Sequence, residues 1–265
     1  MSVMVRDVAR QAANVVGAVF QVAVPVVTGP AVGRVSGENP TLVVPGDYAF
    51  VIWTPIFLLA LVYAVYQALP SNRENPLLRR VGWFSALTYF SNGVWEILFP
   101  AREFVLSQVV FVGITGGAIA AFVLVQRGAG WGGWFDRWLV APAFGLLAGW
   151  VTAAFFVGLV TVLVATGALN GGVGEALFGA LMLIVGGAVA CAVVLAGRTG
   201  PAQGYLAYGG PCCGPWRGWS PTSTRTPSSR PPPPSSAPWS SRRSSSSRCA
   251  GRGPPEAPDS LRGRG

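Results

Sequence analysis

Long apolar runs separated by short polar segments dominate the pattern of this chain. Each run, folded as a helix, is long enough to cross the roughly 30 Å hydrocarbon core of a bilayer. Lipid offers no partners to backbone polar groups, and the sequence lacks the ten-residue alternation of a membrane barrel, so the runs predict transmembrane helices. Six such spans are predicted, at 12–33, 47–69, 79–99, 104–126, 138–166 and 173–197.

Composition supports this interpretation. Hydrophobic residues make up 51% of the chain and charged residues only 11%, whereas about a quarter of the residues of a soluble domain are charged. We therefore predict an all-α integral membrane protein with a helical domain over residues 12–198. Residues 199–209, which include the apolar sequence Tyr205–Tyr208, predict the start of a seventh, truncated helix.

Arginine placement predicts the orientation of the chain. The chain has no His, and arginine is its only basic residue. Eight of the ten arginines before residue 210 precede the first run or follow the second, fourth and sixth, and only Arg34 and Arg102 lie on the other side. Cytoplasmic loops are enriched in basic residues. We expect a multi-pass protein of the cell inner (plasma) membrane, with residues 1–11 as a cytoplasmic N-terminus and an uncleaved first helix.

Residues 210–265 differ in character from the rest. They hold 13 Ser, 12 Pro and 9 Arg, and Leu261 is their only Leu, Ile, Val, Phe or Met. Such a composition predicts a disordered tail. It could be a basic arm for anionic lipid or nucleic acid, or a proline-rich ligand around Pro231–Pro234. We favour a third explanation, a frameshift that reads GC-rich codons out of frame, and expect no specific nucleic-acid partner.

Histidine, a common catalytic and metal-binding side chain, is missing. Without His there is no Ser-His or Cys-His pair and no His metal ligand. Cys191 lies inside a predicted span, and Cys212, Cys213 and Cys249 lack the spacing of a zinc site. We expect no catalytic residue, no metal and no enzyme activity.

Tryptophan placement suggests a binding site. In the predicted topology, Trp53 and Trp95 lie in the same outer leaflet and Trp150 lies near mid-depth, so the three could line a pocket beneath the connection 34–46. Tryptophan also favours membrane interfaces without any ligand. From the residues alone both interpretations stay open. The belt interpretation is preferred for Trp83, Trp131, Trp134 and Trp138.

Glu96 is the acidic residue nearest to these aromatic side chains. It lies about one turn before Pro100, with Arg34 and Arg102 on the same side of the membrane. An ionisable residue deep in a membrane span marks a functional site, whereas a shallow one is commonly solvated. We expect a solvated ion pair at the interface.

Two motifs carry a family resemblance. The segments PGDYAFVIWTPIF (Pro45–Phe57) and NGVWEILF (Asn92–Phe99) resemble the tryptophan-rich sensory protein family, also called TspO/MBR or translocator protein. The second matches the pattern Asn-x-x-Trp-x-x-x-Phe at every spacing, and Trp150-x-x-x-Ala154 matches part of the last-helix motif. The first motif is one residue short and has Tyr48 and Phe57 in place of Trp and Tyr. The resemblance covers roughly residues 12–166.

The resemblance implies a five-helix bundle, to which this chain adds at least one C-terminal transmembrane helix, and a homodimer. It also implies a membrane sensor or translocator that binds a flat hydrophobic molecule, such as the tetrapyrrole protoporphyrin, as ligand and not as cofactor. Trp53, Trp95 and Trp150 would stack on the ligand, Asn92 would orient it, and Phe50, Phe57, Phe99 and Ala154 would complete the pocket. The alternatives are a secondary transporter of a small metabolite and a membrane scaffold without ligand.

Overall fold

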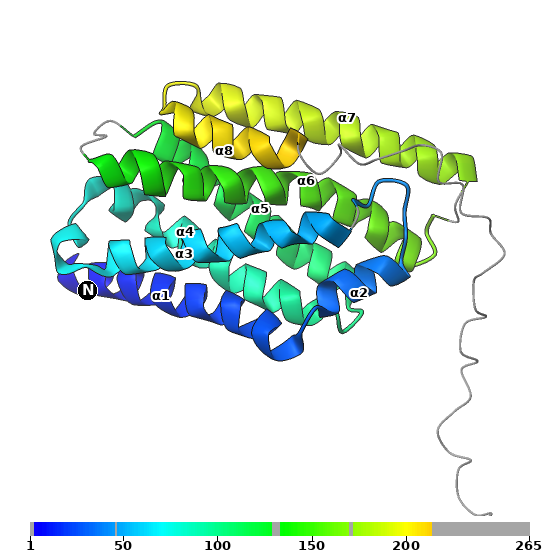
Figure 1. The fold of residues 1–265 in the computed structure, drawn as a ribbon, viewed down its shortest axis with the longest axis horizontal. Coiled ribbons are helices and arrows are strands. Elements are labelled where there is room, and N and C mark those ends of the chain that lie inside the picture. The colour runs from blue at the N-terminus through cyan, green and yellow to red at the C-terminus, as the bar shows by residue number, and fades with distance from the viewer. Residues whose placement is uncertain (1–2, 46, 129–132, 170–171, 214–265) are drawn as a thin grey trace, which may run out of the picture. The chain divides into compact units, whose positions relative to one another are not determined.

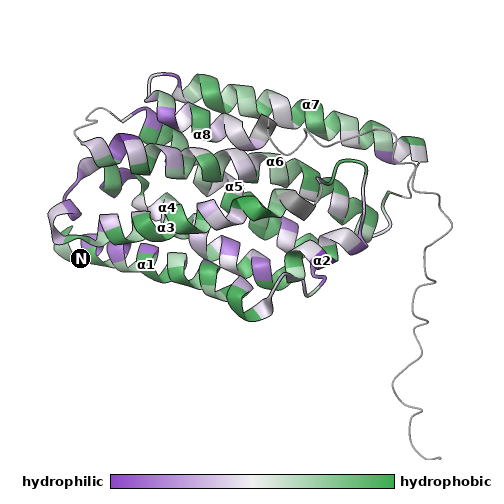
Figure 2. Cartoon of the chain, in the orientation of Figure 1, coloured by the Kyte–Doolittle hydropathy of each residue, from purple (hydrophilic) through white to green (hydrophobic). Residues whose placement is uncertain are grey.

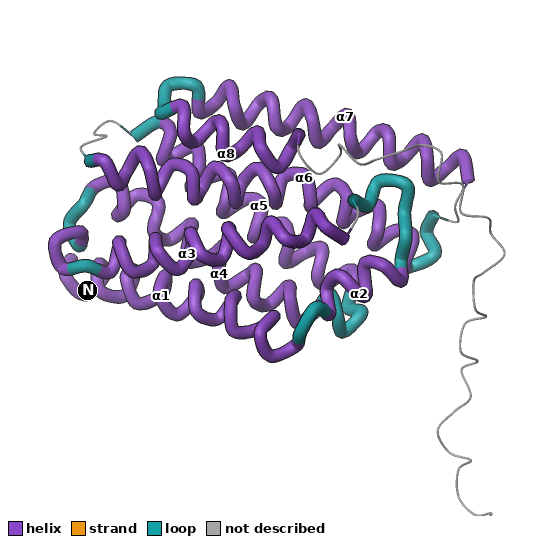
Figure 3. Tube along the Cα trace, viewed as in Figure 1, coloured by secondary structure: helices purple, strands orange, loops and turns teal. Residues whose placement is uncertain are grey.

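Every regular element in the described part of the chain is a helix (Figure 1, Figure 3). The computed structural model describes residues 3–45, 47–128, 133–169 and 172–213. The predicted all-α membrane class is confirmed, whereas the tail from residue 214 onward lies outside the described residues. The elements are α1 (Val3–Thr28), α2 (Ala31–Glu38), η1 (Asp47–Ile52), α3 (Trp53–Ala68), η2 (Pro70–Asn72), α4 (Pro76–Leu98), α5 (Phe104–Gln126), η3 (Asp136–Val140), α6 (Ala141–Ala165), α7 (Gly172–Gly197) and α8 (Ala202–Cys213).

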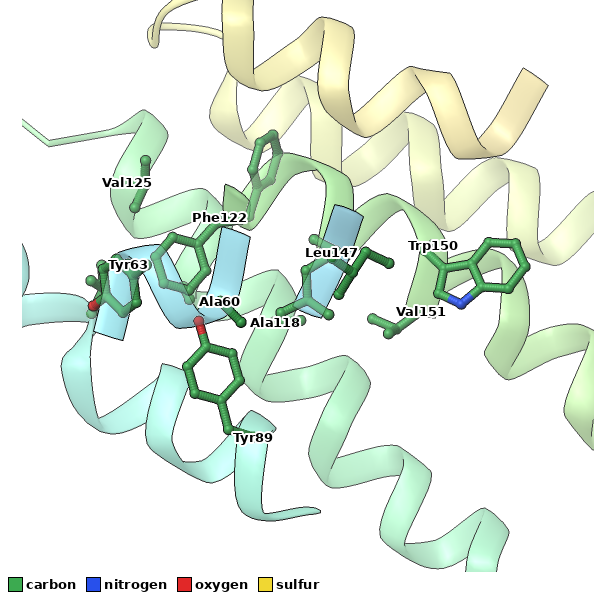
Figure 4. Close-up of a cluster of buried hydrophobic side chains, with 14 of the residues drawn as sticks. Ala60, Tyr63, Tyr89, Ala118, Phe122, Val125, Leu147, Trp150 and Val151 are labelled. Atoms are coloured by element: carbon green, nitrogen blue, oxygen red, sulfur yellow. The ribbon is translucent and has the colours of Figure 1, made fainter. Parts of the chain in front are cut away.

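Five of the long helices close into a ring. Helix α1 packs on α4, α4 on α5, α5 on α6, α6 on α3, and α3 returns to α1. Helices α7 and α8 both pack against α6 (Figure 1). Large buried side chains fill the interior, among them Tyr63, Tyr89, Phe122 and Trp150 (Figure 4). The fold is therefore a five-helix bundle with two further helices packed against α6.

Helix α4 is more polar than the other long helices. Five stretches have the length and hydropathy of a membrane span, namely Val3–Thr28, Ala49–Ala68, Phe104–Gln126, Asp136–Ala165 and Gly172–Gly197. The third predicted span, now α4, is not among them, because it carries Ser85, Thr88, Asn92 and Glu96. All four are buried against neighbouring helices. The chain is a multi-pass membrane protein in which α4 buries its polar side chains against other helices.

Helix α1 begins earlier than the sequence predicts, at Val3 instead of residue 12. The additional residues include Asp7, Arg10 and Gln11, which are buried against α3 and α4 instead of lying in solvent. Hydropathy alone moved the predicted start inward because it assigns polar residues to water. The helix ends at Thr28, where Gly29 adopts φ +67°, a conformation that glycine tolerates best.

Helices α7 and α8 differ in how they meet the bundle. Helix α7 is apolar along most of its length (Figure 2), and only a small part of it is buried. Helix α8 approaches α6 closely at Gly145 and Gly149, because glycine has no side chain. A Cβ at either position would overlap the backbone of α8. Helix α8 continues to Cys213, so it includes residues 210–213, which we had assigned to the tail.

Candidate functional site

An aromatic pocket lies between α3, α4, α5 and α6. Its cover is α2 together with the connection that follows it, through Val32, Ser36, Val44 and Pro45. Six of the eight predicted site residues line it, and they come from η1, α3, α4 and α6: Phe50, Trp53, Trp95, Phe99, Trp150 and Ala154. The structure thus brings together most of the residues that the sequence singled out.

Three indole rings meet in this pocket. The ring centroids of Trp53 and Trp95 are 6.4 Å apart and their planes differ by 29°, whereas Trp150 meets Trp53 edge-on at 6.2 Å. Phe99 stacks on Trp95 at 5.3 Å. Offset-stacked and edge-to-face pairs at these separations are favourable beyond the area that they bury. The rings therefore form one packed cluster and are not isolated interface residues.

Helical spacing explains how each ring reaches the pocket. Trp95 and Phe99 lie four residues apart, so α4 presents both on one face. On α6, Trp150, Ala154 and Gly158 share a face for the same reason, and all three line the pocket. The small residues at 154 and 158 leave open space one and two turns beyond the indole. Trp53 is the first residue of α3, directly after the tight turn of η1.

The pocket is narrow. Its cavity volume is about 70 Å³, which holds only a few water molecules, whereas pockets for drug-sized ligands measure roughly 300–1,000 Å³. A macrocycle would need to part Trp53 from Trp95, since one flat molecule between two rings requires roughly 7–8 Å at ordinary contact distances. In the described conformation the pocket is too small for a drug-sized molecule.

Polar atoms in the pocket are few. The indole Nε1 of Trp150 is buried and has no hydrogen-bond partner within the described residues. Gln108 also lines the pocket and donates from Nε2 to the Phe155 carbonyl at 3.1 Å. An unpartnered buried N–H is costly, so Trp150 offers a donor to an acceptor atom of a bound molecule. The sequence predicts Asn92 as the polar residue that would orient a ligand.

Phe57 and Asn92 are the two predicted site residues that do not line the pocket. Phe57 stacks on Trp53 at 5.3 Å and supports that ring from behind. Asn92 lies fully buried between α4 and α1, where its Nδ2 donates to Oε1 of Gln21 at 3.3 Å and to Oε1 of Glu96 at 3.2 Å. The hydrogen bond to Gln21 thus holds the Asn92 side chain against α1, away from the pocket that Trp95 lines.

The expectation for Glu96 was wrong. Its side chain is buried, with 4% of its surface exposed, and it accepts a hydrogen bond from Asn92 instead of pairing with an arginine at the interface. Arg102 pairs with Glu38 at 2.6 Å. Glu96 points toward α1 because the polar face of α4 is the face that α1 covers. Depth along the helix did not reveal this.

Sequence reasoning missed the contributions of α5 and of the distant end of α6. Phe111 and Gln108 on α5 line the pocket, as do Val157 and Thr161 on α6. Val157 and Thr161 continue the stripe of Trp150, and helical spacing could have found them. Phe111 carried no such signal. In the described part of the chain, no three His, Cys, Asp or Glu side chains gather as metal ligands.

Comparison with known proteins identifies a family. Residues 9–206 match the family model of the TSPO-like protein, which includes every helix of the five-helix ring. No curated protein and no solved structure matches the chain. The match extends through α7 and into α8, well past the five-helix part that carried the motifs. The chain belongs to the TSPO-like protein family.

Proposed function

We propose that this protein is a membrane sensor or translocator whose aromatic pocket binds a flat hydrophobic molecule, with a tetrapyrrole such as protoporphyrin as the first candidate. Membership of the TSPO-like family supports a ligand-binding or sensing role in the membrane in general. The observation that carries the proposal is the convergence of Trp53, Trp95 and Trp150, from three helices, on one apolar pocket. An interfacial belt does not require such convergence.

The geometry suggests how a ligand would be held. Trp53 and Trp95 are close to parallel, so a flat molecule entering between them replaces one ring-ring contact with two ring-ligand contacts. Trp150 then donates its free N–H to an acceptor atom at the edge of the ligand. The proposal includes no catalytic step and no cofactor. It places the pocket in the outer leaflet of the plasma membrane, since arginine placement favours a cytoplasmic N-terminus, and it includes a homodimer.

A titration with matched tryptophan variants tests the proposal. Protoporphyrin is added to the full chain in neutral detergent, and binding is followed by the shift of its own absorption band and by tryptophan quenching. We expect saturable binding that weakens about threefold to tenfold in Trp53→Phe and Trp95→Phe, since an aromatic pair contributes roughly 0.5–1.5 kcal/mol. Trp138→Phe is the control, because Trp138 is 55% exposed and lies outside the pocket.

Binding that is unsaturable, or equally weakened by the control, would contradict the proposal. Thermal unfolding of each variant in detergent separates lost binding from lost folding. With ten tryptophans in the chain, quenching alone does not identify the site, so the absorption shift of the ligand is the primary signal.

One observation favours a second candidate function, secondary transport of a small metabolite. Gln21, Asn92 and Glu96 form a buried polar group, and each keeps one polar atom without a partner in the described residues. Ionisable residues inside a membrane bundle often mark ion or proton pathways. Proton flux into proteoliposomes, read by an internal pH dye, tests this candidate. Flux abolished by Glu96→Gln would favour it, and absence of flux would remove it.

A further inference from the structure

A second hollow, unlike the aromatic pocket, lies where α1 and α4 begin. It is lined by Val3, Arg6, Asp7, Arg10, Arg79, Arg80 and Trp83, and its volume is about 420 Å³. We call it the arginine hollow. It is wide and charged, whereas the aromatic pocket is narrow and apolar.

Both helices begin at this hollow, because they run parallel. The residue numbers of the hydrogen-bonded pairs increase together on the two helices, from Asp7 with Arg79, through Asn14 with Gly82, to Gln21 with Asn92. The N-terminus of a helix carries partial positive charge and favours anions, and cations there are unfavourable. Neither helix has an acidic residue in its first turn. Two positive helix ends and four guanidinium groups therefore share one hollow.

The carboxylates near the hollow do not balance the positive charge of its arginines. Asp7 is buried and accepts hydrogen bonds from Arg79 at 3.0 and 3.1 Å. Glu74 lies 3.7 Å from Arg79 and is 84% exposed. Within the described residues, Arg6 and Arg80 form no ion pair. Two carboxylates thus face four arginines, and the excess is positive.

Arg10 is the buried member of the group. Only 1% of its surface is exposed, and its Nη atoms donate to Gln67 and to the carbonyls of Leu78 and Arg73. Its Nε has no hydrogen-bond partner in the described residues, and it lies 3.8 Å from Oδ1 of Asp7, too far for a hydrogen bond. Arg10 lines the hollow, so its guanidinium adds positive charge at the wall, and its buried, unpartnered Nε–H favours an anionic oxygen nearby.

We propose that the arginine hollow binds the phosphate of an anionic lipid headgroup. The shared chemistry is a phosphate ester with net negative charge, for which arginine is well suited. The neighbouring side chains favour a lipid over a soluble ester. Val3 is 69% and Trp83 42% exposed beside the hollow, and exposed tryptophans are enriched near the membrane–water interface. Basic pockets between transmembrane helices bind anionic headgroups in this way.

Native mass spectrometry of the full chain in neutral detergent tests the site. Short-chain phosphatidic acid is titrated beside phosphatidylcholine with the same acyl chains. We expect phosphatidic acid to bind more tightly, and the double variant Arg6→Gln/Arg80→Gln to lose roughly tenfold or more in affinity for it, since each basic residue near a surface contributes measurably to anionic lipid binding. Phosphatidylcholine binding should not change.

The matched control is Arg34→Gln/Arg137→Gln, which removes two other exposed arginines and leaves the hollow intact. It keeps the net charge of the test variant, so nonspecific attraction is the same in both. Equal loss in the two double variants, or no loss in the first, would overturn the proposal. Competition by millimolar glycerol phosphate identifies the source: resistance supports a lipid, whereas displacement with the same arginine dependence keeps the phosphate site but overturns the lipid assignment.

Discussion

Two faces of α4 lie in different surroundings. One face presents Trp95 and Phe99 to the aromatic pocket, whose lining has few polar atoms. The other faces α1 with Ser85, Asn92 and Glu96, and hydrogen bonds join it to that helix. The aromatic face encloses a collapsible cavity, whereas the polar face is packed and partnered along most of its length. We infer from this difference that the polar face is committed to the fold, and we propose that the aromatic face is the one that meets a ligand.

Membrane physics explains the division. Lipid tails are as apolar as leucine, so apolar side chains gain little by leaving lipid for a helix interface, and close packing and hydrogen bonds hold transmembrane helices together. On the polar face, Asn14 donates to the Gly82 carbonyl at 2.6 Å, and Gly82 lets Arg10 lie against α4. In the described residues, Trp95 and Phe99 contact their neighbours through ring packing, and we propose that these rings part when a ligand binds. Substitutions at three positions of the contact between α1 and the polar face of α4, and at one position of the aromatic face, test this contrast.

The largest loss of stability should follow from Arg10→Leu. The substitution leaves Gln67 and the carbonyls of Leu78 and Arg73 without their buried donor. Breaking a buried charged network costs about 3 kcal/mol. Unfolding in sodium dodecyl sulfate, followed by circular dichroism, measures it. Arg137→Leu, at an exposed arginine, is the control and should change the free energy of unfolding by less than about 0.5 kcal/mol.

Gly82→Ala should cost about 2 kcal/mol, within the range for overpacked sites. The added Cβ would lie 2.6 Å from Cδ and 2.8 Å from Cγ of Arg10, and the hydrogen bonds of Arg10 prevent that side chain from moving away. Gly116→Ala is the matched control, since nothing in the described residues lies within 4 Å of its new Cβ. The same unfolding assay applies. Equal costs at the two glycines would show that α1 and α4 are not held closely.

Smaller effects are expected at Glu96. Glu96→Gln keeps the shape of the side chain and removes the need to bury a charge, so the free energy of unfolding should rise or stay within about 1 kcal/mol. Glu96→Ala loses the hydrogen bond from Asn92 and leaves a void, and should cost about 1–2 kcal/mol. If Gln were as damaging as Ala, the carboxylate itself would be required, which would contradict the expected role of Glu96 as a hydrogen-bond acceptor for Asn92.

The smallest change in stability should come from Trp95→Phe. The ring keeps its contacts with Phe99 and Phe111 in part, so we expect a cost below about 1 kcal/mol in the same assay. A cost comparable with that of Gly82→Ala would mean that the aromatic face also holds the fold together.

Much of this architecture follows from hydropathy, because lipid leaves helices as the only open choice for runs of this length. Helical spacing predicts that Phe99 lies beside Trp95 and Ala154 beside Trp150, whereas the meeting of Trp53, Trp95 and Trp150 in one pocket depends on how three helices pack. Asn92 and Glu96 were misplaced because a single chain does not say which neighbour covers each face of α4. The sequence does not predict the early start of α1, because Asp7 and Arg10 are charged and are expected in solvent. In the structure, α4 provides their hydrogen-bond partners.

The central claim, that the two faces divide binding from folding, is tested most directly by crossing two variants with two assays. Protoporphyrin affinity and the free energy of unfolding are measured for Trp95→Phe and for Gly82→Ala. The account predicts that Trp95→Phe weakens binding about threefold to tenfold with little change in stability. Gly82→Ala should lose about 2 kcal/mol of stability and bind as the unmodified chain does. Affinity that falls with stability in both variants, or that is indifferent to Trp95, would contradict it.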